Sequence, residues 1–156
     1  MTKWLIANPQ SRIEYTIKET PLLHACCARN QLGALGINGD TRIDIRPEVK
    51  PNIVCDITKK IPFEDNSFAA AFADFPWIAA WKREVAAAMK ELLRVAPIVY
   101  TISPWVYGSS SCYPEKIFIQ WMPGVQQALL FTKYVRNEEG RAEGTADASS
   151  TKEGQR

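Results

Sequence analysis

The stretch FAAAFADFPW, residues 68–77, carries the clearest indication of the fold of this chain. Its first part, Phe68–Ala73, is a short and wholly apolar run, which is typical of a strand that is covered on both faces. The acid Asp74 follows this run directly, and Phe75, Pro76 and Trp77 follow the acid. This order predicts a rigid, partly apolar ledge just past a buried strand. A flat heterocycle could lie on that ledge while a polar group faces its exocyclic nitrogen.

Further runs on both sides of this stretch predict the rest of a sheet. Strands are expected at residues 22–27, 41–45, 52–56 and 98–102, and two more at residues 117–122 and 128–135. The last two are joined by a turn that contains Pro123 and Gly124, so an antiparallel hairpin is expected there. Short apolar strands with a crossover helix predict an α/β, Rossmann-like fold with a mostly parallel sheet.

A single clear helix is expected over Trp81–Val95. Val85, Met89 and Leu92 lie on one side of this Ala-rich stretch, and Pro97 marks its end. The segment 28–40, after the first expected strand, holds three glycines and is too short and broken for a long helix. A reduced helix complement is therefore expected.

The chain divides into three parts by composition. Residues 1–20 are a polar lead-in whose two weak strand patterns, at 4–6 and 13–17, predict a hairpin. Residues 21–136 are expected to form one domain. Residues 137–156 contain no large apolar side chain, so we expect a disordered tail.

Composition narrows the class of protein. The 156 residues carry a net charge of +2, which permits a polyanionic partner without arguing for one. No apolar run approaches the ~18 residues of a membrane span, and Met1–Arg12 is too polar for a signal peptide. We therefore expect no membrane association and a cytoplasmic location.

The cysteines show no spacing of a known metal site. The chain has four cysteines and one histidine, His24, beside the adjacent pair Cys26 and Cys27. Structural zinc sites need four ligands, usually with two cysteines separated by two to four residues, and that pattern is absent. Reduced thiols and no bound metal are the expectation.

Acids follow three of the expected strands. Asp44 ends the second, Asp56 follows the third and Asp74 follows the fourth, while the first ends at His24–Cys27. The carboxyl ends of parallel strands meet at one edge of a sheet, where ligands bind in this class of fold. A single acid at such a place is commonly a helix cap or a turn former. Three in succession predict a shared binding crevice.

The order of these residues resembles the class I S-adenosylmethionine-dependent methyltransferases. The resemblance is to a compact group of that family and covers about residues 21–135. The expected strand hairpin at 117–135 is also similar to the last two strands of that fold. The matching stretches are residues 24–28, 39–44, 51–56, 61–68 and 74–77. The most specific of them is Ile-Pro-Phe-x-Asp-x-Ser-Phe at 61–68, followed by Asp-Phe-Pro-Trp at 74–77, where the family has Asp-Pro-Pro-Tyr or Asp-Pro-Pro-Trp.

The resemblance implies S-adenosylmethionine as cofactor and a set of binding roles. The backbone at His24, Ala25 and Cys26 would pass under the methionine part of the cofactor. Asp44 would accept hydrogen bonds from the ribose hydroxyls. Asp56 would face the adenine amino group.

The resemblance further implies that Ile57 covers the adenine ring. Asp74, Phe75, Pro76 and Trp77 would form the catalytic element that holds the methyl acceptor. In the family members that act on amino groups, this element commonly binds adenine in nucleic acid. The acceptor nitrogen would attack the sulfonium methyl in line, so positioning would supply most of the rate.

Three residues depart from the family pattern: Ala28 and Phe75 replace a glycine and a proline, and Ala69 replaces an acid. They favour an alternative in which a degenerate methyltransferase fold serves as a binding or scaffold subunit. A third interpretation is a nucleotide-binding or dehydrogenase-like module. The sequence lacks the glycine fingerprint of such modules, which speaks against it. Because helices would be missing on one face of the sheet, we also expect a homo-oligomer or a partner subunit.

Overall fold

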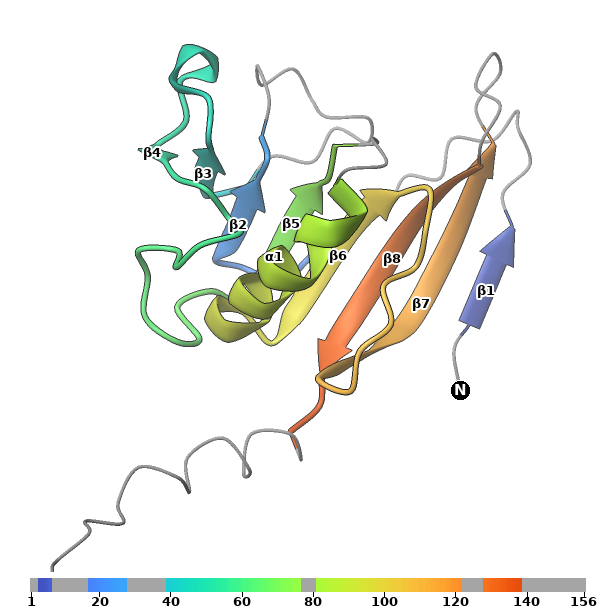
Figure 1. Ribbon diagram of the computed structural model, residues 1–156. Helices are drawn as coiled ribbons and strands as arrows, with labels where there is room; N and C mark the ends of the chain where they lie inside the picture. Colours follow the sequence, from blue (N-terminus) through green and yellow to red (C-terminus); the bar gives the residue numbers. More distant parts are fainter. Residues whose placement is uncertain (1–2, 7–16, 28–38, 77–80, 122–127, 139–156) are drawn as a thin grey trace, which may run out of the picture.

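The computed structural model describes residues 3–6, 17–27, 39–76, 81–121 and 128–138. Within these ranges the chain forms one eight-stranded sheet, a short 3-10 helix, η1, and an α-helix, α1 (Figure 1). The bounds are β1 Lys3–Ile6, β2 Leu22–Ala25, β3 Thr41–Asp44, η1 Pro47–Val49, β4 Ile53–Val54, β5 Ala70–Asp74, α1 Trp81–Val95, β6 Ile98–Ser103, β7 Cys112–Trp121 and β8 Ala128–Arg136.

The sheet is mostly parallel. Its strand order is β1-β7-β8-β6-β5-β2-β3-β4. Every neighbouring pair is parallel except the two that contain β8, which runs antiparallel to both β6 and β7. The predicted mixed sheet with a C-terminal antiparallel pair is confirmed.

Helix α1 packs on one face of the sheet over β5 and β6 (Figure 1), and its inner side belongs to the larger of two core clusters. It lies in front of β5 and β6 in Figure 1. Met89 and Leu92 are fully buried on its inner side, in one cluster with Ala71 and Ala73 of β5. Alternate residues of a strand point to opposite faces, so these two alanines are the small side chains beneath the helix.

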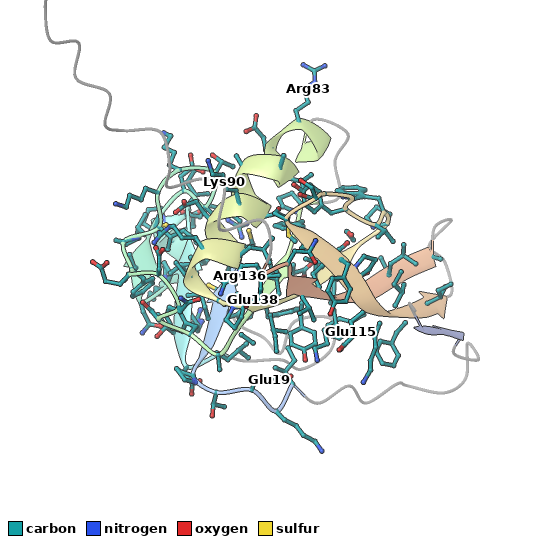
Figure 2. The ribbon with its side chains drawn as sticks, turned by 90° about the horizontal axis from the view of Figure 1, so that it is seen from below. Glu19, Arg83, Lys90, Glu115, Arg136 and Glu138 are labelled. Atoms are coloured by element: carbon teal, nitrogen blue, oxygen red, sulfur yellow. The ribbon has the colours of Figure 1, made fainter. Side chains whose placement is uncertain are left out.

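The opposite face of the sheet is also buried in the single chain. Seven side chains form a second cluster there: Leu22, Ala70, Phe72, Tyr100, Ile102, Leu129 and Phe131, none more than 5% exposed. The Tyr100 hydroxyl donates a 2.9 Å hydrogen bond to Glu19, which also lies 3.7 Å from the Lys133 ammonium. Figure 2 shows Glu19 on the side of the sheet away from α1. Among the described residues, β2, β5, β6 and β8 therefore show no bare apolar face, and a bare face there gives no argument for an oligomer.

Residues Lys3–Ile6 of the N-terminal segment join the sheet as β1. Strand β1 pairs in parallel with β7, with Lys3 beside Lys116 and Ile6 beside Ile119. Residues 13–16, the expected partner within the hairpin, lie outside the described residues, and Ile17 is not in a strand. A partner more than a hundred residues away leaves no mark on a local pattern, so the sequence did not predict this pairing, and the expected hairpin stays a prediction.

Other bounds differ from the expectations at their ends. The strand expected at 52–56 is reduced to Ile53–Val54, because the chain turns after the Cys55 N–H donates to the Asp44 carbonyl at 2.9 Å. Strand β7 begins at Cys112, earlier than expected, with an irregular register at Pro114, which has no N–H to donate. Of the expected tail, Asn137 is held by its N–H on the Ser111 carbonyl, and residues 139–156 lie outside the described part.

A search of the described helices for a membrane span gives a negative result. None is both long enough and apolar enough to cross a bilayer.

Gly39 is required by a close backbone contact with β2. A Cβ atom there would lie 2.7 Å from the His24 Cβ and 2.8 Å from the Leu22 carbonyl oxygen. We expect Gly39→Ala to lower the free energy of unfolding by about 1–3 kcal/mol, the range for overpacking a tight site. Urea denaturation measures this. Gly108→Ala is the matched control, because nothing lies within 4 Å of its Cβ position, and an equal loss in both variants would contradict the prediction.

Candidate functional site

A cavity of about 540 Å³ opens at the carboxyl ends of the parallel strands. Three acids line it: Asp44 from the end of β3, Asp56 just after β4, and Asp74 from the end of β5. The structure therefore brings together the three carboxylates that sequence reasoning placed at strand ends. The remaining wall is Cys26, Ile45, Arg46, Cys55, Ile57, Phe75 and Pro76.

The position of the cavity follows from the order of the strands. From β2 the chain moves outward to β3 and β4, and it then returns to β5 on the other side of β2 before continuing to β6. The sheet thus reverses its direction of growth between β2 and β5. Loops that leave the two strands diverge at such a point and leave a crevice, which is where open α/β sheets bind ligands.

Asp44 is the most buried of the three acids. Its side chain is 3% exposed and is held by Arg46, whose Nε and guanidinium NH2 donate to the two carboxylate oxygens at 3.0 Å each. The Arg46 backbone N–H also donates to Oδ1 at 3.0 Å. Arg46 itself is 51% exposed, and the neighbouring carboxylate raises its pKa. The acid is thus charge-paired within the protein itself.

Asp56 shapes the turn after β4. Its Oδ1 accepts hydrogen bonds from the Thr58 hydroxyl at 2.7 Å and the Thr58 backbone N–H at 3.0 Å. These bonds hold the pKa of the carboxyl below its ordinary value. Lys59 lies 3.6 Å from the other oxygen, Oδ2. Asp56 is therefore ionised at neutral pH and turns one oxygen toward the Lys59 side, while the buried side chain of Ile57 adds apolar wall beside it.

The element after β5 is placed as a wall and not as an exposed platform. Phe75 is 2% exposed and belongs to the core cluster beneath α1, so its ring cannot serve as an open stacking surface. Asp74 is half-buried and Pro76 is exposed, and both line the cavity. Trp77 lies outside the described residues. The ledge expected from the sequence is thus corrected at Phe75, whose apolar side chain is drawn into the core.

The residues at the end of β2 take different positions. Cys26 lines the cavity with a left-handed φ of 54°, a conformation that favours glycine. Burial, together with the charges of Asp44 and Asp74, raises the pKa of its thiol, so it is a neutral wall group. Ala25 is fully buried within the strand. His24 points to the face opposite α1, against the ring of Phe72 at 5.0 Å, and does not line the cavity.

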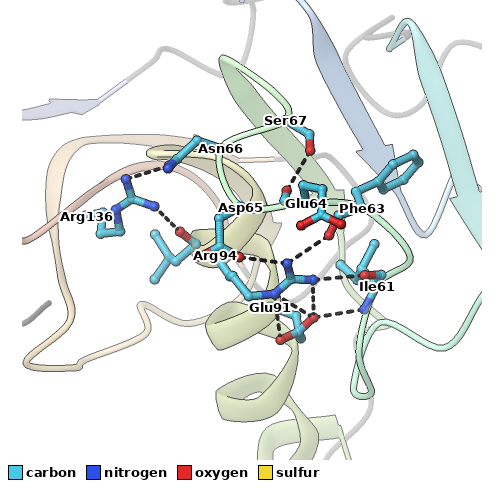
Figure 3. A network of polar contacts seen from close by, with 10 residues as sticks. Ile61, Phe63, Glu64, Asp65, Asn66, Ser67, Glu91, Arg94 and Arg136 are labelled. Atoms are coloured by element: carbon cyan, nitrogen blue, oxygen red, sulfur yellow. Dashed lines mark hydrogen bonds and ion pairs between the residues drawn. The ribbon is translucent and has the colours of Figure 1, made fainter. Parts of the chain in front are cut away.

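The segment 61–68, the most specific part of the family resemblance, is held to the end of α1 by Arg94 (Figure 3). The guanidinium donates to the carbonyl oxygens of Ile61 at 2.9 Å and Phe63 at 2.8 Å, and to Asp65 at 3.0 Å. Glu91 pairs with Arg94 at 2.8 Å and accepts the Ile61 N–H at 2.8 Å. This motif therefore has a structural role: it fixes the chain that follows the Asp56 turn.

Sequence reasoning missed three parts of the wall: Ile45, Arg46 and Cys55. Ile45 is 61% exposed, which is unusual for a large apolar residue and fits a surface that a ligand covers. The signal was available, because Ile45 and Arg46 directly follow a strand-end acid. Among the described residues, no three His, Cys, Asp or Glu side chains are grouped so that they could hold a metal ion.

Comparison with known proteins gives the fold alone. No family model and no curated protein matches the chain. Among solved structures, the chain is similar to the crystal structure of PH0226 protein from Pyrococcus horikoshii OT3. The TM-score is 0.50 at 16% identity, over 74% of this chain and 81% of that one. The fold is α/β and Rossmann-like, as predicted.

The Arg94 contacts predict a stability effect. We expect Arg94→Lys to lower the free energy of unfolding by about 2 kcal/mol, because a single ammonium cannot reach the carbonyl and carboxylate acceptors that the guanidinium serves together. Chemical denaturation of both proteins measures it. Arg83→Lys, at an exposed arginine of the same helix, is the control and should stay within about 0.5 kcal/mol. Equal stability of the wild type and Arg94→Lys would contradict the structural role.

Buried His24 predicts a loss of stability in mild acid. Burial, with a smaller contribution from Arg42, lowers the pKa of its imidazole from 6.5 to about 4. Because the folded pKa is the lower one, the unfolded chain takes up the proton first, and stability falls as the pH drops below 6.5. We expect a loss on the order of 2–3 kcal/mol between pH 6.5 and 4.5.

Urea denaturation across this pH range checks the effect. The lowered pKa values of Asp56 and Glu91 put their own losses below about pH 4.5, outside the window. His24→Phe keeps a ring against Phe72 and removes the proton site, so its stability should be flat over the same range. A slope that persists in this variant would assign the effect to other groups.

Proposed function

We propose that this protein is an S-adenosylmethionine-dependent methyltransferase that acts on an amino group, with adenine in nucleic acid as the leading acceptor. The observation that carries the proposal is the arrangement of the cavity: carboxylates from the ends of three parallel strands line one space at the point where the sheet reverses its growth. The resemblance in the motifs at 39–44, 61–68 and 74–77 adds the choice of cofactor.

The dimensions of the cavity suit a nucleoside-containing ligand. Sites for small molecules and cofactors span roughly 300–1,000 Å³ and combine apolar walls with a few polar groups. Here Ile45 and Ile57 provide apolar wall beside Asp56, which could accept hydrogen bonds from an exocyclic amino group. Asp44, at the end of the strand beside β2, stands where an acid accepts ribose hydroxyls in dinucleotide-binding α/β proteins.

The charge of the cavity also favours the proposed cofactor. Three acids and one arginine, Arg46, line it, so the charged side chains described there carry a net negative charge. A sulfonium ion carries a positive charge that a negative field attracts. Asp74 would lie nearest the methyl acceptor, where its oxygen could accept a hydrogen bond from the amino group that is methylated. Proximity and alignment of nitrogen and methyl carbon would then supply most of the rate.

Two contacts favour the alternative, a scaffold that performs no chemistry. Arg46 already satisfies both oxygens of Asp44, and Thr58 satisfies one oxygen of Asp56. Acids whose oxygens are already bonded inside the protein can serve the fold without a ligand. Binding measurements separate the two functions.

The decisive experiment is isothermal titration with S-adenosylmethionine and S-adenosylhomocysteine. Under the enzyme proposal both bind in about the micromolar range, and Asp44→Ala weakens binding by at least tenfold, since it removes the acceptors for the ribose. Glu64→Gln removes one exposed negative charge away from the cavity and should bind like the wild type. No heat with either ligand would favour the scaffold.

Transfer of a labelled methyl group tests the role of Asp74. DNA, RNA and protein are offered separately to identify the acceptor. We expect Asp74→Asn to reduce transfer by a hundredfold or more, because an amide cannot replace the charge beside the acceptor amine, while the affinity for S-adenosylhomocysteine, which carries no sulfonium charge, changes little. Unchanged turnover in this variant would remove Asp74 from the mechanism.

A further inference from the structure

Arg46 occupies the acceptor atoms that a ribose would need. It donates from Nε to Oδ1 and from NH2 to Oδ2 of Asp44, and its backbone N–H adds a third bond, to Oδ1. A carboxylate offers about four acceptor sites on its two oxygens. Two adjacent hydroxyls that bind in the same bidentate manner therefore compete directly with the guanidinium.

The two members of the pair differ in their freedom to move. Asp44 is 3% exposed and lies at the end of β3, paired with β4 through Val54. Arg46 is 51% exposed and stands on the loop that leads into η1, with its side chain on the cavity wall. Of the two, only the guanidinium can leave the contact for water without disturbing the sheet.

We propose that Arg46 is a latch that determines specificity: it closes the Asp44 subsite, and a ligand with two adjacent hydroxyls opens it by replacing the guanidinium on both carboxylate oxygens. This inference rests on the proposed function and extends it to a residue that the resemblance does not include. A buried carboxylate is costly without partners. A ligand without the diol leaves that cost unmet and gains nothing from displacing the latch.

The latch predicts a gain of affinity that depends on the diol. Arg46→Met keeps much of the side-chain length and removes the competing donors from the guanidinium. S-adenosylhomocysteine should then bind about fivefold tighter than to the wild type, the value of a weak, partly exposed ion pair. Its 2′,3′-dideoxy analogue should show no gain. Arg46→Lys keeps the charge with one donor centre, so its affinity for S-adenosylhomocysteine should lie between those of the wild type and Arg46→Met.

Lys59→Met is the matched control. It removes a cation that lies 3.6 Å from Asp56, near the same cavity, and leaves Asp44 paired. A diol-dependent gain confined to the Arg46 variants supports the latch. An equal gain for the dideoxy analogue, an equal gain in Lys59→Met, or weaker binding by Arg46→Met overturns it.

The same titrations separate this inference from the proposed function. Equal binding of S-adenosylhomocysteine by the wild type and both Arg46 variants overturns the latch and leaves the cofactor proposal standing. Absence of binding in all of them overturns both. Binding by the Arg46 variants alone supports a latch that keeps the site shut. Cooperative thermal unfolding of each variant shows that the comparison is between folded proteins.

Discussion

The parallel pairing of β2 with β3 on one side and β5 on the other is the constraint on which the site depends. It makes the central strands run together, so their carboxyl ends meet at one edge, and it reverses the growth of the sheet at that place. The central strands carry small, buried side chains on this face: Ala25, Ala71 and Ala73 are fully buried. Small side chains let α1 sit closely on one face, and the polar groups that end the strands are left at the edge, where they can line a cavity.

Two of the acids at this edge, Asp44 and Asp56, are held by their own neighbours in the chain. Asp44 depends on Arg46 two residues later, and Asp56 depends on Thr58 at the same spacing. Both pairings are local turn contacts of the kind that Asp forms in loops, and they remove the cost of an unpaired charge. The same contacts that stabilise the turns lower the availability of the carboxylates, so a ligand that used the proposed site would compete with them for the same oxygens.

The segment 61–68 carries a family resemblance in its sequence and also has a structural role in the fold. As a stretch of sequence, followed by residues 74–77, it is the most specific part of the resemblance to methyltransferases. In the structure its backbone carbonyls converge on Arg94, and Glu91 closes the contact from the same helix. The segment thereby anchors the chain between the Asp56 turn and β5. Its contacts have a structural role, and in the functional proposal the resemblance of this segment adds only the choice of cofactor to the argument from the cavity.

The existence of the strands, of helix 81–95 and of the acids at strand ends could be predicted from the sequence, because these depend on local periodicity and on residue order. The pairing of β1 with β7, the burial of Phe75 and the hold of Arg46 on Asp44 came only from the tertiary structure. Each of these depends on which groups meet in space. The residue pattern of a strand does not show which strand it pairs with. An aromatic residue beside a proline can face either the core or the solvent. The donor that binds a carboxylate is decided only by the folded conformation of the loop around it.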